Sequence, residues 1–171
     1  YMTRRDITVA LYHLAGSPKV ELPATSPYGD ITPDDPDYAA YIWARQQGVT
    51  FGWVDGNFHP YVQLSPRSIV AFLYRYQRSR GKVSPSLPTA APQPRNGSLP
   101  GSKDSELSTK NWATELEDGS AFWRESRWAV QQRIWGYAKD GRHEYFTWEQ
   151  TPTDDLALML YRMEHGGSHL K

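Results

Sequence analysis

The chain contains no cysteine among its 171 residues, which excludes disulfide bonds, thiol nucleophiles and cysteine metal sites. Hydrophobic residues make up only 39%, so a shared core is expected to be small. No stretch approaches the roughly 18 consecutive apolar residues that a membrane-spanning helix needs. Lysine plus arginine and aspartate plus glutamate both number 19. The resulting net charge of zero gives no general attraction to nucleic acid or to an acidic membrane.

Two segments rich in proline, serine and glycine divide the chain into three blocks. The first is residues 16–27, "GSPKVELPATSP", and the second is residues 81–108; both have few large apolar side chains. Both are therefore predicted to be linkers or extended surface straps, and the second linker is placed at residues 81–112 in the division into units. The start at Tyr1, with no signal-peptide cleavage pattern after it, indicates a fragment of a longer protein.

The blocks on either side of the long linker repeat one another. "WARQQGVTFGW", from Trp43, matches "WAVQQRIWGY", from Trp128. Further on, "PRSIVAFLYRY" matches "TDDLALMLYRM", and a third copy of this part opens the chain as "TRRDITVALYHLAG". Repetition of this length predicts supersecondary units that pack on one another.

Each full unit is predicted to form a helix, a loop and a second helix. In the second block Pro36 precedes an apolar face that runs to Trp43, and Gly48 is placed to end that helix. The corresponding helix of the third block is expected to begin at Ser120. Pro66 and Pro152 mark the starts of the second helices, where a missing N–H costs nothing. The predicted fold class is therefore all-α.

These residues resemble the S-layer homology (SLH) domain family in its actinobacterial form. The family pattern has a lead "F-x-D-V", a helix ending in "W-A-x-x-x-G-I", a loop "G-Y-x-D-G-x-F-x-P" and a "T-R-A-E" turn that opens a helix ending in "L-Y-R". Residues 28–76, "YGDITPDDPDYAAYIWARQQGVTFGWVDGNFHPYVQLSPRSIVAFLYRY", follow it almost throughout. The third block follows it more weakly, and the first block matches only the second helix.

The resemblance implies helix-loop-helix units packed with pseudo-threefold symmetry around a central helical bundle. Unit 1 is represented by its second helix alone, residues 1–15, unit 2 by residues 28–80 and unit 3 by residues 113–167, all in one compact domain. It also implies a non-catalytic, extracellular module that binds secondary cell-wall polysaccharide and anchors a secreted bacterial protein to the cell surface. No cofactor is expected.

The resemblance assigns ligand contacts to the "T-R-A-E" positions, because a guanidinium grips a carboxylate with two hydrogen bonds and a helix N-terminus offers free N–H groups. In unit 1 these positions are Thr3 and Arg4. Unit 2 has Pro66 where the arginine belongs and a shifted cation, Arg67, and unit 3 has Thr153 there. The alternative hypothesis is accordingly a divergent structural or protein-interaction module that packs on its parent protein or on a partner.

The loop aromatics Trp53 and Tyr137 could stack on a sugar ring or wedge the loop against a helix, and both readings stay open. The acidic stretch "DITPDDPD" could suggest a calcium site or a catalytic carboxylate pair, but acids are favoured at a helix start, so we interpret it as helix capping. His165 and His169 have a spacing of four, yet the glycines between them disfavour a helical metal site. Neither a metal site nor an enzyme is predicted.

Overall fold

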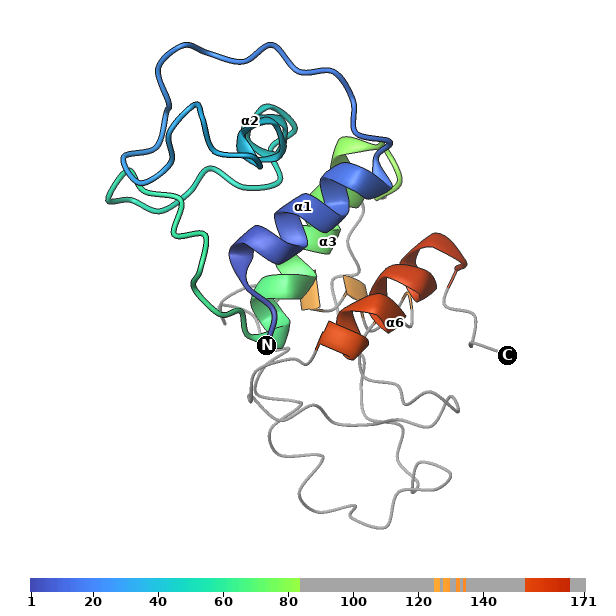
Figure 1. The fold of residues 1–171 in the computed structure, drawn as a ribbon. Helices are drawn as coiled ribbons and strands as arrows, with labels where there is room; N and C mark the ends of the chain where they lie inside the picture. Colours follow the sequence, from blue (N-terminus) through green and yellow to red (C-terminus); the bar gives the residue numbers. More distant parts are fainter. Residues whose placement is uncertain (84–124, 127, 130–131, 133, 135–152, 167–171) are drawn as a thin grey trace, which may run out of the picture.

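A computed structural model describes residues 1–83, 125–126, 128–129, 132, 134 and 153–166 (Figure 1). Within these ranges the regular elements are four helices and one isolated antiparallel bridge, between Thr3 and Gln63. The predicted all-α class is confirmed for this part of the chain. Most of the predicted 81–112 linker and of the leading helix of unit 3 lies outside the described residues. None of the helices found here has the length and apolar character to cross a membrane.

Helix α1, Arg4–Leu14, begins at a capping box formed by Thr3 and Asp6. The Thr3 hydroxyl accepts a hydrogen bond from the Asp6 N–H at 3.2 Å, and the Asp6 carboxylate accepts from the Thr3 N–H at 2.9 Å. This reciprocal capping box satisfies two backbone donors at once. Ile7 and Leu11, four residues apart along the helix, are fully buried.

Helix α2, Tyr38–Gln46, is the leading helix of unit 2. It ends as predicted at Gly48, whose φ of +73° is readily adopted only by a residue without a side chain. Its apolar side chains are buried on more than one side of the helix. Figure 1 shows why: the long connections before and after α2 run around it, so loop segments cover the sides that other helices leave open.

The second helices of units 2 and 3 are α3, Pro66–Ser79, and α6, Thr153–Glu164. Ser65 caps α3 by accepting from the Ser68 N–H at 3.3 Å, with Pro66 as the first helical residue. The prediction that prolines mark these starts is confirmed, since α6 begins directly after Pro152. An ion pair at 2.7 Å between Arg80 and Glu164 joins the ends of the two helices.

The matching leading-helix segments of units 2 and 3 have the same local backbone structure. The Val49 N–H donates to the Ala44 carbonyl at 2.8 Å, and the Ile134 N–H donates to the Ala129 carbonyl, also at 2.8 Å. All four side chains are buried. The sequence repeat therefore corresponds to equivalent turns at the end of each leading helix.

One hydrophobic cluster draws on α1, α2, α3, the unit 3 residues Trp128, Ala129 and Ile134, and α6. A second, smaller cluster lies between α2 and its loops and consists of Tyr28, Ile31, Tyr38, Tyr41, Ile42 and Phe58. Units 1, 2 and 3 thus share the first cluster, whereas the second belongs to unit 2 alone.

Residues 16–27 form the extended surface strap that the sequence predicts. Two tyrosine hydroxyls hold it: Tyr12 donates to the Pro18 carbonyl at 3.0 Å and Tyr38 donates to the Pro23 carbonyl at 2.9 Å. Val20 packs against both hydrophobic clusters. The strap therefore covers part of the core although most of its side chains are exposed.

Candidate functional site

The candidate site is the loop of unit 2, residues 48–64, together with the N-terminus of α1. At its tip the Gly56 N–H donates to the Trp53 carbonyl at 3.1 Å and the Trp53 N–H donates to the Asn57 carbonyl at 2.8 Å, so Asp55 and Gly56 form a turn. Gly52 has a φ of +81°, and a Cβ there would lie 2.6 Å from the Asn57 carbonyl oxygen. The loop requires glycine at this position.

Phe58 fixes the returning strand of the loop to the domain. Its side chain is fully buried, and its ring lies 5.2 Å from that of Tyr28 and 4.5 Å from that of Tyr41. The Asp30 carboxylate accepts from the Phe58 and His59 N–H groups, both at 2.7 Å. Asp30 was expected to cap a helix, but it binds loop backbone 28 residues away. Charge-assisted bonds of this kind are stronger than neutral ones.

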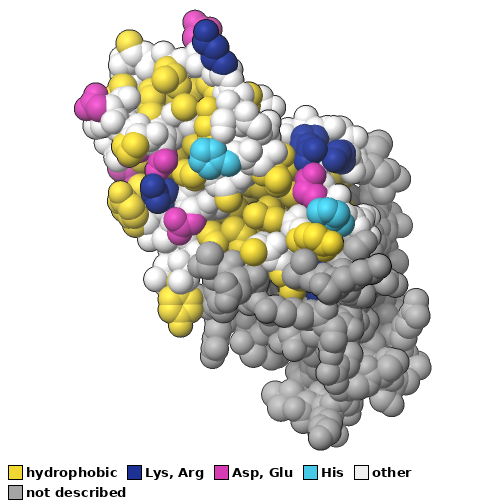
Figure 2. Space-filling model, turned by 45° about the vertical axis from the view of Figure 1, so that its right-hand side comes forward, with side chains coloured by type: hydrophobic (Ala, Val, Ile, Leu, Met, Phe, Trp, Pro, Cys, Tyr) yellow, Lys and Arg dark blue, Asp and Glu magenta, His cyan; other side chains and the backbone are white. Residues whose placement is uncertain are grey.

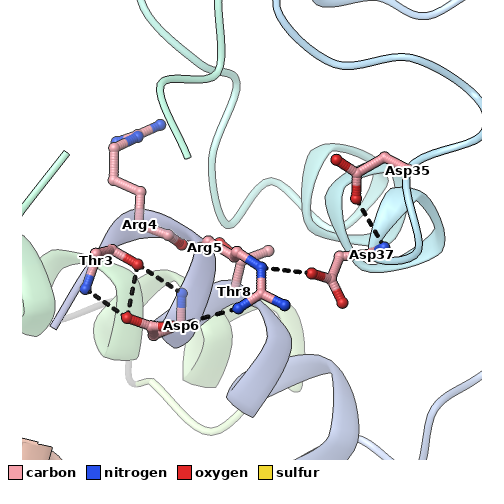
Figure 3. Close-up of polar contacts among 7 residues, drawn as sticks. All are labelled: Thr3, Arg4, Arg5, Asp6, Thr8, Asp35 and Asp37. Carbon is pink, nitrogen blue, oxygen red and sulfur yellow. Dashed lines mark hydrogen bonds and ion pairs between the residues drawn. The ribbon is translucent and has the colours of Figure 1, made fainter. Parts of the chain in front are cut away.

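Arg4 holds the same loop segment from the other side. Its side chain is only 7% exposed, and Nε donates to the Phe58 carbonyl at 2.7 Å while Nη2 donates to Thr50 Oγ1 at 3.1 Å. The guanidinium also lies over the rings of Phe58 and Phe72, at 5.0 and 5.4 Å from their centroids. Burial lowers the pKa of Arg4, yet an arginine remains protonated in a protein. Figure 3 shows the side chain directed away from the capping box.

The N–H groups at the start of α1 are also used within the protein. The Arg4 N–H donates to the Val62 carbonyl at 3.0 Å and the Arg5 N–H donates to the Pro60 carbonyl at 2.8 Å. The next N–H donates to the Thr3 hydroxyl. This differs from the expected anion site at Thr3 and Arg4, because a helix N-terminus binds an anion through N–H groups that lack a partner.

Arg5, and not Arg4, is the more exposed cation at this helix start. Its Nε lies 2.6 Å from a carboxylate oxygen of Asp37, which raises the pKa of Arg5 (Figure 3). Asp37 precedes α2 without capping it, and Asp35 accepts from the Asp37 N–H at 2.8 Å. The capping interpretation of the acidic stretch is therefore corrected: Asp37 links α2 to α1 instead.

The outer face of the loop carries a cluster of three side chains. Trp53 is 48% exposed, and its ring centroid lies 4.1 Å from that of His59. His59 Nε2 lies 2.6 Å from Asp55 Oδ2. The hydrogen bond from the Asn57 N–H, followed by that with His59, lowers the pKa of Asp55. Trp53 therefore packs on another loop residue and keeps about half of its surface open.

Two further exposed aromatic residues of the loop were not recognised as candidates from the sequence. Phe51 is 63% exposed and Tyr61 is 76% exposed. Arg45 donates to the Phe51 carbonyl at 3.0 Å and its guanidinium lies 5.9 Å from the Phe51 ring centroid. The sequence did contain a signal for their exposure, because both residues flank the buried Phe58 in the same loop. Side chains of such a loop can alternate between core and solvent.

Arg67 and Tyr137 are the other two residues predicted to contact a ligand. Arg67 is the second residue of α3 and is half-buried. Tyr137 lies outside the described residues. Within those residues, no three histidine or acidic side chains are grouped so that they could hold a metal ion.

The loop thus combines an open indole face with hydrogen-bonding carboxylate and imidazole groups on a backbone fixed by Asp30 and Arg4. Such a surface is suited to binding, because an aromatic ring offers an apolar face and the polar groups supply direction. Comparison with protein-family models, with curated proteins and with solved structures finds no match to the chain.

Proposed function

We propose that the protein is a non-catalytic module that binds wall-associated polysaccharide and anchors a secreted bacterial protein at the cell surface. The SLH-like order of signals in residues 28–76 motivates this function, with its units arranged around a central helical bundle. One observation carries the proposal: the unit 2 loop holds Trp53 half-exposed beside Asp55 and His59 on a backbone that is fixed from beneath.

Sugar rings suit this surface better than a bare anionic group does. A pyranose ring presents an apolar C–H face that an indole can cover, and its hydroxyls can bond to the Asp55 carboxylate and the His59 imidazole. Arg4 and Thr3 enter the proposal as supports of the loop and not as ligand contacts, since their polar groups are already engaged. Arg67 at the start of α3 is proposed as a secondary contact.

Binding to purified wall sacculi tests the proposal. The 171-residue chain should sediment with intact sacculi and lose most of that binding once the secondary polysaccharide is stripped from them. Replacing Trp53 by alanine should weaken binding by up to about tenfold, since a stacked aromatic contributes about 0.5–1.5 kcal/mol beyond its buried area and about 1.4 kcal/mol corresponds to a factor of ten. Leu22→Ala is a matched control, because Leu22 is 49% exposed on the strap and remote in sequence from the loop.

Two results would contradict the proposal. One is failure to bind both kinds of sacculi, and the other is binding that Trp53→Ala leaves at the wild-type level. Far-UV circular dichroism of each variant separates lost binding from lost folding.

The second candidate function is a structural or protein-interaction module that does not bind glycan. It is favoured by the internal use of the Arg4 guanidinium and of the α1 N–H groups, which removes the anion site that the SLH resemblance implies for unit 1. Normal folding with no sacculus binding, together with capture of a defined domain of the same secreted protein, would support this function over the first.

A further inference from the structure

His59 joins the exposed indole of the unit 2 loop to the rest of that loop. Its ring centroid lies 4.1 Å from that of Trp53, with an angle of 38° between the two ring planes. Its Nε2 lies 2.6 Å from Asp55 Oδ2, and its carbonyl accepts from the Val62 N–H at 3.2 Å. The position of the Trp53 ring therefore depends on a histidine that is fixed on both its side chain and its backbone.

The backbone at residue 59 indicates that the imidazole ring has a role of its own. His59 has a φ of +58°, in the left-handed region that residues other than glycine adopt uncommonly. Strained backbone of this kind is found at sites where a side chain has to be held in one direction. Here that direction brings the ring onto Trp53 and Asp55.

The charged groups that face His59 are carboxylates. Asp55 pairs with its ring, and Asp30, from the segment before α2, accepts from its backbone N–H at 2.7 Å. Among the described residues no basic side chain contacts His59. Its surroundings therefore favour a proton on the ring, because an opposite charge nearby stabilises the charged form.

The basic side chains at the start of α1 have other partners. Arg4 donates to the Phe58 carbonyl, and Arg5 is paired with Asp37. On the face shown in Figure 2, Lys and Arg side chains are likewise interspersed with Asp and Glu side chains. The charge of His59 is thus governed by the two carboxylates of its own unit.

Protonation of His59 changes the forces on the indole. Histidine is the side chain whose charge ordinarily changes between about pH 5 and 8. Asp55 stays ionised in that range, because the Asn57 N–H and then His59 lower its pKa. A proton on His59 makes the bond to Asp55 an ion pair and places a positive charge within cation–π reach of the Trp53 ring.

We propose that His59 positions Trp53 for sugar binding, and that protonation of His59 makes this binding tighter in mildly acidic than in mildly alkaline surroundings. The inference rests on the proposed function, because the bound group is the glycan assigned to Trp53. An indole that is already fixed loses less conformational freedom when a sugar ring stacks on it. Loss of the proton frees the indole and weakens binding without removing the site.

Binding to sacculi at two pH values tests the inference. The wild-type chain should bind roughly fivefold more tightly at about pH 5.5 than at about pH 8, the size expected from one exposed cation–π contact and one exposed ion pair together. His59→Gln cannot gain a charge, so its binding should be equal at both pH values and close to the weaker wild-type level. His59→Arg stays charged at both, so its binding should also be independent of pH. All variants meet the same sacculi, so charge changes of the wall itself cancel in the comparison.

His13→Gln is the matched control. His13 is exposed on α1, and its Nδ1 lies 2.8 Å from Ser17 Oγ, outside the unit 2 loop. This variant removes a histidine of the same chain and should keep the wild-type pH dependence of binding. Circular dichroism at both pH values shows whether each variant is folded.

A nuclear magnetic resonance titration tests the same coupling without glycan. The indole N–H signal of Trp53, identified by its absence in Trp53→Ala, should shift with pH at the same midpoint as the ring-carbon signals of His59. In His59→Gln this shift should disappear. A histidine that only fills space would leave the indole signal unmoved.

The outcomes separate the inference from the function on which it rests. Absence of sacculus binding at both pH values would sink the proposed function, while the indole titration would still judge the coupling of His59 to Trp53. Three results would overturn the inference itself: equal wild-type binding at the two pH values, a pH dependence that persists in His59→Gln, and an indole signal that does not follow His59.

Discussion

Replacement of Arg4 by alanine tests the central structural conclusion, that this arginine holds the unit 2 loop. The substitution removes the hydrogen bonds to the Phe58 carbonyl and to Thr50 Oγ1 and leaves that buried carbonyl without its donor. It also removes a guanidinium that packs over two aromatic rings. The loop would lose one of its side-chain anchors, while Asp30 would keep its bonds to the Phe58 and His59 N–H groups.

The expected loss in the free energy of unfolding follows from these contacts. A hydrogen bond from a charged donor contributes about 1.5–3 kcal/mol, and an orphaned buried acceptor costs a similar amount, with considerable overlap between the two. Allowing for that overlap, we expect Arg4→Ala to lower the free energy of unfolding by about 3 kcal/mol. Arg4→Lys should recover only part of this loss, because an ammonium cannot reproduce the planar stacking and the two separate donor directions.

Arg5→Ala is the matched control at the neighbouring position. The Arg5 side chain is 40% exposed, and its main contact is the ion pair with Asp37 at 2.6 Å. Ion pairs of such exposure contribute about 1 kcal/mol or less, so the control variant should remain close to the wild type. Both variants remove one positive charge from the same helix start, which separates the effect of burial from that of charge.

Urea unfolding followed by far-UV circular dichroism and by tryptophan fluorescence measures the difference. A surface role for Arg4 as a ligand contact predicts the opposite pattern, normal stability with impaired binding. Equal stability of Arg4→Ala and Arg5→Ala, within about 0.5 kcal/mol, would refute the reasoning because substitutions at ordinary surface positions fall in that range.

Three further predictions concern the same loop. Gly52→Ala should lower the free energy of unfolding by more than about 2 kcal/mol, because it combines a positive φ with a Cβ only 2.6 Å from a carbonyl oxygen. Gly56→Ala, with the same φ but open space around the Cβ, should lower it by about 1 kcal/mol in urea unfolding. Equal losses of stability for the two variants would contradict the steric argument. Asp30→Ala should lower the free energy of unfolding by about 2 kcal/mol in the same assay, because it leaves the N–H of the buried Phe58 without its acceptor. A change near zero would show that the carboxylate does not anchor the loop. The pKa of Asp55 is lowered in the folded protein, so the carboxylate's contribution to stability is present above the ordinary pKa of 3.8 and is lost as the pH falls through the lower folded pKa. The difference in stability between wild type and Asp55→Asn should therefore disappear in acid. A difference that persists or grows in acid would contradict the assignment.

The sequence by itself determined the helices and the places where they begin and end. Thr3 and Ser65 precede α1 and α3 with capping side chains, and Gly48 ends α2. These are local effects, since each depends on residues within about four positions along the chain. The burial of Phe58 could also be predicted, because an aromatic in the repeated loop needs a core position.

The direction of the Arg4 side chain was decided only by the tertiary structure. Its hydrogen-bond partners are 54 and 46 residues away, so no local pattern names them. A signal was nevertheless present, because Arg4 shares a helix face with Ile7 and Leu11, which are fully buried. A cation at an apolar position of the helical repeat indicates a buried donor as readily as a ligand contact.

Asp30 and Asp37 illustrate the same division. Both belong to an acidic stretch before α2, where the sequence predicts helix capping. In the folded chain Asp30 binds the backbone of the loop in its own unit and Asp37 pairs with Arg5 of α1, because packing brings donors that are distant in the sequence next to these carboxylates. The sequence determines which residues can accept a hydrogen bond, and the packing of the units determines which donor each of them meets.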